Sequence, residues 1–235
     1  MYVTGRTERG GTPPTPLPGT VQETADEVTA AGGRGVAIGC DHRDDEQTRR
    51  AVHEVVADAG RLDVLVNNVW GGYEYFWDGT PFWEEAGFWT QPIERWDAAF
   101  QAGVRAHYVT TVAAAPTMVA AGSGLIVNVS SEGAEKTDTG VAYGAAKAAT
   151  DHMVACMAHE LREYGVTAVS LYPGLVRTES VLRAAEFIDL TDSESPLFVG
   201  RGVASLAADP DVIRHTGRVV RTGELGREYG FSDPG

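Results

Sequence analysis

The segment "LDVLVNN" (62–68) decides the fold class of this chain. It is a short apolar run, and such a run predicts a strand that is buried on both faces. Three further segments have the same character: "GVAIGCD" (35–41), "GLIVNVSS" (124–131) and "GVTAVSLYPG" (165–174). Helical patterns fill the intervals, at about 20–31, from Asp44 onward, and at roughly 92–121 and 142–164. Buried strands that alternate with helices predict an α/β fold with a Rossmann-like, doubly wound parallel sheet.

Composition limits the class of protein and its partners. The 235 residues are 43% hydrophobic and show neither a repeat nor a linker, so we expect one domain, 1–235. The formal net charge of −14 would repel nucleic acid and anionic lipid. The most apolar long stretch, residues 109–121, is too short to span a bilayer. We therefore expect a small-molecule substrate, with no nucleic acid and no membrane as partner.

The two cysteines, Cys40 and Cys156, lie in separate apolar segments. This placement favours reduced core residues of a cytoplasmic protein over a disulfide framework or a metal site.

The chemistry concentrates in "YGAAK" (143–147), at the start of a predicted helix. Tyr143 and Lys147 lie four residues apart and therefore share one helix face. A phenol is a poor base at neutral pH, and a neighbouring ammonium favours its ionised form. The chain has two lysines, Lys136 and Lys147, against seventeen arginines, so a lysine at this position indicates a need for a compact charge. Taken alone, the pair is equally consistent with a tyrosine at the core edge beside a solvated lysine.

Four motifs in a fixed order identify a family resemblance. "LVNN", "NVSS", "YGAAK" and "PGLVRT" follow one another over residues 35–180 and resemble the short-chain dehydrogenase/reductases (SDRs). The similarity extends over essentially the whole chain. It implies an oxidoreductase that transfers hydride between a nicotinamide dinucleotide and a carbonyl or alcohol, in a homodimer or homotetramer.

The resemblance also implies the roles of individual residues. Tyr143 would be the catalytic acid/base, and Lys147 would lower its pKa and bind the nicotinamide ribose. A serine at the end of "NVSS" would hydrogen-bond the substrate carbonyl; we choose Ser131, with Ser130 as the alternative. The other implied cofactor contacts are Asp41 at the adenine, Asn67 beside the cofactor, and Pro173, Gly174 and Thr178 at the nicotinamide end. Gly103 stands where the family usually has a catalytic asparagine, so a proton relay through that side chain is in doubt.

The opening stretch, "MYVTGRTERGGTPPTPLPG" (1–19), resembles the second strand of the family and not the first. The family's glycine signature, Thr-Gly-x-x-x-Gly-x-Gly, would need glycine at Arg9. Four prolines follow, and proline offers no N–H to a phosphate. We therefore expect the chain to be truncated at its N-terminus relative to the family, through a misplaced start or in a shortened paralogue. Stability and cofactor binding of the chain as given would then be low.

Arg6 follows this first strand directly, where the Rossmann fold reads the adenosine 2′ position. An arginine there accommodates the 2′-phosphate, which favours NADP(H) over NAD(H); the alternative is a solvated loop arginine.

An aromatic-rich segment, residues 70–96, holds all five tryptophans. It follows a strand at the edge where ligands bind in doubly wound sheets, so we expect it to form a pocket for a bulky apolar substrate. The substrate contacts expected there are Trp70, Tyr73 and Trp77. The alternative is a loop that packs its own aromatic side chains.

Two classes of function therefore remain from the sequence. One is an SDR-type oxidoreductase. The other is a cofactor-free relative, either a binding or regulatory protein or a non-redox acid–base enzyme with the same serine and tyrosine.

Overall fold

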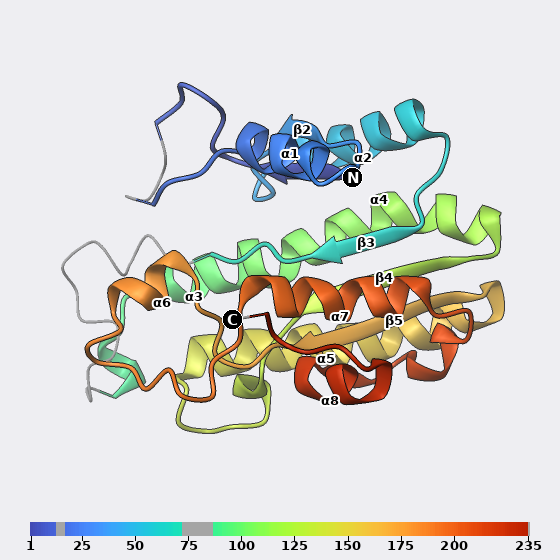
Figure 1. Cartoon of the computed structure of the whole chain (residues 1–235). Helices are drawn as coiled ribbons and strands as arrows, with labels where there is room; N and C mark the ends of the chain where they lie inside the picture. Colours follow the sequence, from blue (N-terminus) through green and yellow to red (C-terminus); the bar gives the residue numbers. More distant parts are fainter. Residues whose placement is uncertain (13–16, 72–86, 235) are drawn as a thin grey trace. The chain divides into compact units, whose positions relative to one another are not determined.

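The computed structural model describes residues 1–12, 17–71 and 87–234 (Figure 1). The chain divides into two compact units. Met1–Leu62 and Val69–Ala114 form the first unit, and Asp63–Asn68 and Ala115–Gly235 form the second.

The first unit contains a two-stranded parallel sheet. Strand β1 (Tyr2–Gly5) pairs with β2 (Val36–Gly39), and helix α1 (Val21–Ala30) connects them. Helix α2 (Asp45–Ala59) follows and packs Ala51 and Val55 against Ile38 and Cys40. Side chains cap both helices, because Thr20 accepts from the Glu23 amide and Asp44 from the amides of Glu46 and Gln47.

A bulged helical segment follows, and its part up to Ala114 completes this unit. The turn η2 (Phe88–Thr90) leads to α3 (Ile93–Phe100), then to the π-helical turn η3 (Gln101–Arg105) and to α4 (Ala106–Ala121). The sequence predicts one uninterrupted helix over 92–121, and this was wrong at η3. A π turn accommodates one extra residue per turn, and here it includes Gly103, beside which Trp70 packs.

The second unit contains a four-stranded parallel sheet. Its strands are β3 (Val64–Asn67), β4 (Gly124–Val129), β5 (Val166–Tyr172) and β6 (Val219–Arg221), paired in that order. Asn67 lies opposite Asn128, and Asn128 lies opposite Ser170, so the carboxyl ends of three strands are in register. The strands expected from the apolar runs and their parallel pairing are thus confirmed.

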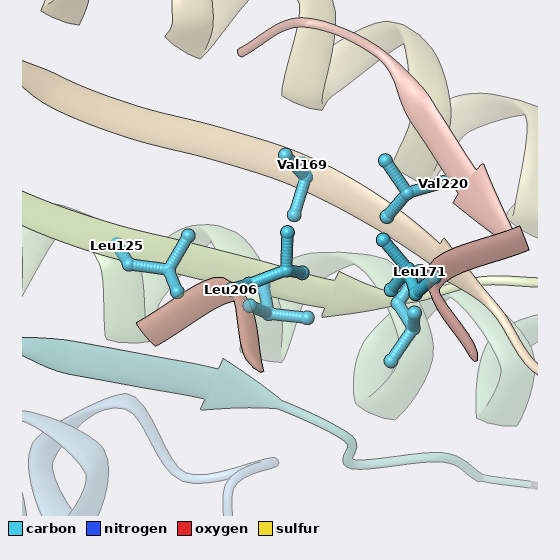
Figure 2. Close-up of a cluster of buried hydrophobic side chains, with 7 residues drawn as sticks. Leu125, Val169, Leu171, Leu206 and Val220 are labelled. Carbon is cyan, nitrogen blue, oxygen red and sulfur yellow. The ribbon is translucent and has the colours of Figure 1, made fainter. Parts of the chain in front are cut away.

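Helices pack on this sheet. The long helix α5 (Val141–Leu161), extended by η5 (Arg162–Tyr164), packs against β5. The remaining elements are η4 (Glu132–Ala134), α6 (Glu179–Arg183), α7 (Pro196–Ala208), η6 (Val212–His215) and α8 (Thr222–Tyr229). Figure 2 shows the main core, in which Leu206 of α7 meets Leu125, Val169, Leu171 and Val220 from three strands.

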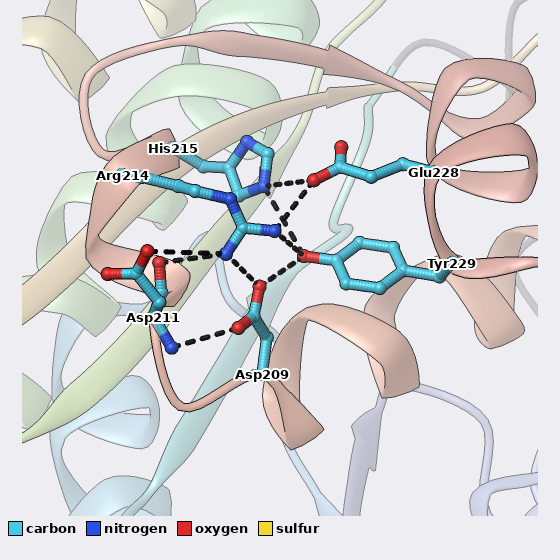
Figure 3. Close-up of polar contacts among 6 residues, drawn as sticks. All are labelled: Asp209, Asp211, Arg214, His215, Glu228 and Tyr229. Carbon is cyan, nitrogen blue, oxygen red and sulfur yellow. Dashed lines mark hydrogen bonds and ion pairs between the residues drawn. The ribbon is translucent and has the colours of Figure 1, made fainter.

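A polar cluster fastens α8 to the segment before β6 (Figure 3). The Arg214 guanidinium binds the carboxylate of Asp209, that of Glu228 at 2.6 Å and the Tyr229 hydroxyl at 3.1 Å. Burial and the Asp209 hydrogen bond raise the pKa of Tyr229 to about 12. Because Asp209 follows α7, this cluster also ties α7 to α8.

The sheet edges and the cysteines differ in part from expectation. Among the described residues, β1 is hydrogen-bonded only to β2, and β3 only to β4, so the expected sheet is present as two sheets. The expected truncation stays a prediction.

Cys40 is buried, but Cys156 is exposed on α5, because that helix buries Val154 and Ala158 and turns the residue between them outward. No helix in the described part of the chain is long and apolar enough to cross a membrane.

Candidate active site

The hydroxyl groups of Ser131 and Tyr143 are hydrogen-bonded, with Oγ and Oη 2.8 Å apart. Ser131 follows β4 and caps η4, where its Oγ also accepts from the Gly133 amide at 3.2 Å. Tyr143 lies in the first turn of α5. The end of a strand and the start of a helix thus bring together two hydroxyls that are twelve residues apart in sequence.

Ser130, the alternative, faces elsewhere. It is buried, and its Oγ donates to the backbone carbonyl of Lys147 at 3.4 Å. The structure therefore joins Ser131, and not Ser130, to the Tyr143 hydroxyl.

Lys147 is buried one turn beyond Tyr143. Its Nζ donates to the Val129 carbonyl at 3.3 Å and lies 5.6 Å from the centre of the Tyr143 ring. Burial lowers the pKa of Lys147 to about 8, against an opposing influence of Asp151. The ammonium therefore remains the favoured form at neutral pH, by a smaller margin than for an exposed lysine.

The pKa of Tyr143 moves in the direction opposite to the sequence expectation. Burial raises it, the hydrogen bond from Ser131 partly offsets this, and the negative charge of Glu132 adds to the rise. The expected lowering of the Tyr143 pKa is therefore not seen. The Lys147 ammonium lies over the Tyr143 ring and donates to the Val129 carbonyl, not to the Tyr143 hydroxyl.

Asn67 lies at the carboxyl end of β3 and is buried. Its Nδ2 donates to Oδ1 of Asn128, the residue opposite it on β4, at 2.8 Å. This pair joins two neighbouring strands through side chains, at the sheet end that also carries Ser131.

Pro173 and Gly174 follow β5 and line a pocket of about 290 Å³ with Glu132, Glu194 and Arg221. The Gly174 amide donates to the Glu194 carboxylate at 3.0 Å. Burial raises the pKa of Glu194, and this amide counteracts the rise. Thr178 is exposed and caps α6, where it accepts from the Val181 amide at 3.4 Å. Three charged groups in this pocket, Glu132, Glu194 and Arg221, were not anticipated, because they come from three separate parts of the sequence and none gives a local signal.

In the first unit, Arg6 and Asp41 follow the two strands of its sheet. Arg6 is exposed directly after β1. Asp41 accepts from Arg43 at 2.7 and 3.0 Å, and these bonds hold its pKa below the ordinary value although burial acts in the other direction. A cofactor contact at Asp41 would therefore share a carboxylate that Arg43 already engages.

Trp70 contacts the residue that replaces the family asparagine. A Cβ at Gly103 would lie 2.6 Å from the Trp70 ring, so the indole fills the space into which a side chain at 103 would extend. The other two expected substrate contacts, Tyr73 and Trp77, lie outside the described residues.

The fit to a nicotinamide dinucleotide differs between its two ends. Buried Lys147 and the Ser131–Tyr143 pair suit the ribose and reacting end. At the phosphate end, the loop after β1 does not replace the family's glycine loop, because the amides of Arg9, Gly11 and Val21 already donate to Gln22, Glu8 and Thr7, at 2.9, 2.8 and 3.0 Å. These three groups therefore do not present free N–H donors to a pyrophosphate.

The parallel α/β architecture, with a serine after β4 and a tyrosine and lysine at the start of α5, defines a Rossmann-like oxidoreductase fold. Residues 17–187 match the model of the short chain dehydrogenase family. The chain is 38% identical over 231 residues to mouse dehydrogenase/reductase SDR family member 1, covering 91% of this chain and 72% of that protein. The human protein of that name is 35% identical over 228 residues with the same coverage. The chain belongs to the short-chain dehydrogenase/reductase family of NAD(P)-dependent oxidoreductases.

Solved structures agree with this fold. A putative dehydrogenase from Xanthomonas campestris aligns over 99% of this chain and 81% of its own, with a TM-score of 0.79 and 23% identity. A metagenomic short-chain oxidoreductase in complex with NADP aligns over 94% of this chain and 84% of its own, with a TM-score of 0.70 and 26% identity.

Proposed function

We propose that the protein interconverts a carbonyl compound and the corresponding alcohol, with Tyr143 as the acid/base. The observation that carries the proposal is the 2.8 Å hydrogen bond between Ser131 Oγ and Tyr143 Oη, with buried Lys147 one turn away. A hydroxyl pair of this kind can bind one carbonyl oxygen from two sides.

In this mechanism the chain's own groups handle the proton. Ser131 Oγ donates a hydrogen bond to the substrate oxygen, and Tyr143 Oη transfers its proton to that oxygen during reduction. In the reverse direction the phenolate accepts the proton from the alcohol. Lys147 stabilises the phenolate and would bind the nicotinamide ribose, with Asn67, Pro173, Gly174 and Thr178 around that end. When bound, the dinucleotide supplies or accepts the hydride.

We further propose NADP(H) as the preferred cofactor and a bulky apolar substrate. The cofactor preference rests on Arg6 after β1, where a 2′-phosphate would lie. The substrate preference rests on the aromatic segment 70–96. Trp70, the first aromatic residue of this segment, packs against Gly103. We also propose a cytoplasmic location, which accords with the free cysteines, and a homodimer or homotetramer, which accords with the family.

The test is the variant Tyr143→Phe, which removes the proton donor and keeps the ring. We expect carbonyl reduction to fall by about 10²-fold or more, with an unchanged thermal midpoint. Tyr164→Phe, at an exposed tyrosine in η5, is the matched control and should keep full activity. Most of the activity surviving in Tyr143→Phe would refute the assignment.

A second candidate function is a cofactor-free relative that binds a ligand or performs acid–base chemistry without hydride transfer. Two observations favour it: the loop after β1 lacks the family's glycine signature, and its Arg9, Gly11 and Val21 amides donate within the chain and so cannot substitute for that signature. Calorimetric titration of the 235-residue chain with NADPH and NADH separates the two. Micromolar binding of either nucleotide contradicts the cofactor-free function, and no heat at millimolar nucleotide contradicts the oxidoreductase function of this chain.

A further inference from the structure

The carboxylate of Asp151 lies on α5 one helical turn beyond Lys147. Tyr143, Lys147 and Asp151 therefore form a row at four-residue spacing on one face of the helix. Asp151 is the acidic member of this row, and the proposed mechanism does not use it.

Asp151 is held from the sheet by Tyr172, the last residue of β5. The Tyr172 hydroxyl donates to Asp151 Oδ2, while Oδ1 is buried and has no hydrogen-bond partner among the described residues. Burial and the Asp151 carboxylate together raise the pKa of Tyr172, so this hydroxyl stays a donor at neutral pH. A carboxylate fixed in this way cannot turn to solvent without breaking its bond to the strand.

Other charged groups surround this row and could share its effect. Arg221 of β6 lies over the Tyr172 ring, 5.2 Å from its centre, and pairs with Glu135 at 2.8 Å. Glu132 of η4 acts on Tyr143, and the Val129 carbonyl of β4 accepts from Lys147. Asp151 is the carboxylate that favours the charged form of Lys147, against its burial.

We propose that Asp151, oriented by the Tyr172 hydroxyl, is a positioning residue that keeps the Lys147 ammonium charged behind Tyr143. Removing the carboxylate would leave a buried ammonium without its counter-charge, and that ammonium would release its proton more easily. This inference rests on the proposed role of Lys147 beside Tyr143. It adds Tyr172 and Asp151 to the groups that set the protonation of the site.

The two lysines of the chain make a direct test practical. Protein labelled with ¹³C at the lysine ε-carbon gives two NMR resonances, and Lys136→Arg assigns them. Lys136 is exposed and paired with Glu132 at 2.7 Å, which raises its pKa, so the two titrations are separated. We expect Lys147 to titrate near 8 in the unaltered protein.

In Asp151→Asn, we expect the midpoint of Lys147 to fall by about one pH unit or more. Lys136 should not move, which reports an intact fold. Asp151→Glu restores the charge and should return the Lys147 midpoint toward its original value. Tyr172→Phe keeps the carboxylate and should lower the midpoint less than Asp151→Asn does.

An Asp151→Asn protein in which Lys147 titrates at its original midpoint would overturn this inference. If Asp151→Asn does not fold, a Lys147 midpoint in Tyr172→Phe equal to that of the unaltered protein would overturn it, since that variant releases the carboxylate from the strand. The titration needs neither cofactor nor turnover. Failure of the proposed function, seen as an active Tyr143→Phe protein, is therefore distinguishable from failure of this inference.

Discussion

The indole of Trp70 lies against Gly103 so closely that a Cβ at position 103 would be 2.6 Å from the ring. Position 103 is where the family resemblance expects a catalytic asparagine, and here it lies in a π-helical turn. An asparagine at position 103 would clash with Trp70 in its present position. The glycine at 103 and the placement of the indole therefore depend on each other.

This contact predicts opposite effects for two glycine substitutions. Gly103→Ala should destabilise the protein by about 1–3 kcal/mol, since the added methyl group meets a rigid ring. Gly200→Ala is the control within a helix, because a Cβ there meets nothing within 4 Å. It should stabilise by about 0.5–1 kcal/mol through the helix preference of alanine. Urea unfolding of both variants measures the difference, and equal effects would contradict the contact at Trp70.

The two serines after β4 should separate in function. Ser131→Ala removes the donor that faces Tyr143 and should lower carbonyl reduction by about 10²-fold. Ser130→Ala removes a buried hydroxyl that bonds to the Lys147 carbonyl at 3.4 Å, so it should cost about 1 kcal/mol of stability and spare most of the activity. Steady-state kinetics and thermal melts on the pair decide this. The reverse pattern would make Ser130 the catalytic serine.

Much of the second unit could be predicted from local sequence. The apolar runs that end in Asn67, Val129 and Tyr172 are strands, because predominantly apolar segments rich in β-branched residues suit a sheet buried on both faces. The nearness of Ser131 and Tyr143 followed from motif order through the family resemblance.

Other features depend on tertiary contacts that no local pattern records. The π turn at Gly103 has no sequence signature distinct from that of a helix. The pKa of Tyr143 is raised mainly by burial, which the four-residue spacing to Lys147 does not reveal. Asp151 could have been found, because it is an acidic residue one turn beyond Lys147 on the same helix face. Its partner Tyr172 is known only from the structure.

Cofactor choice should depend on Arg6. Arg6→Asp replaces a phosphate partner with a repelling charge and should weaken NADPH binding by roughly tenfold, about 1.4 kcal/mol, relative to NADH. Arg201→Asp makes the same charge change at an exposed position on α7 and controls for net charge. Titrations with both nucleotides give the ratio. An equal loss for NADPH and NADH in Arg6→Asp would return Arg6 to the role of a loop arginine.

The buried ammonium of Lys147 should make stability depend on pH in the mildly alkaline range. Its folded-state pKa of about 8 lies below the unfolded value of roughly 10.4, so the unfolded chain binds more protons between these limits. The unfolding free energy therefore gains nothing from this group below the folded-state pKa. It rises as the pH increases toward the unfolded-state pKa, by a total of about 3 kcal/mol. Tyrosines with raised pKa values act in the opposite direction above about pH 10, because the unfolded chain loses their protons first.

The variant Lys147→Met isolates this contribution, since it keeps the aliphatic stem and removes the ionisable group. Urea unfolding of both proteins at intervals between about pH 7 and pH 10 gives the difference in unfolding free energy. We expect the original protein to gain stability relative to Lys147→Met as the pH rises through 8, because its lysine then becomes neutral in the folded state. A difference that stays constant over this range would show that the folded and unfolded pKa values of Lys147 are equal. If the original protein instead loses stability relative to Lys147→Met as the pH rises, the pKa of Lys147 is higher in the folded state than in the unfolded state.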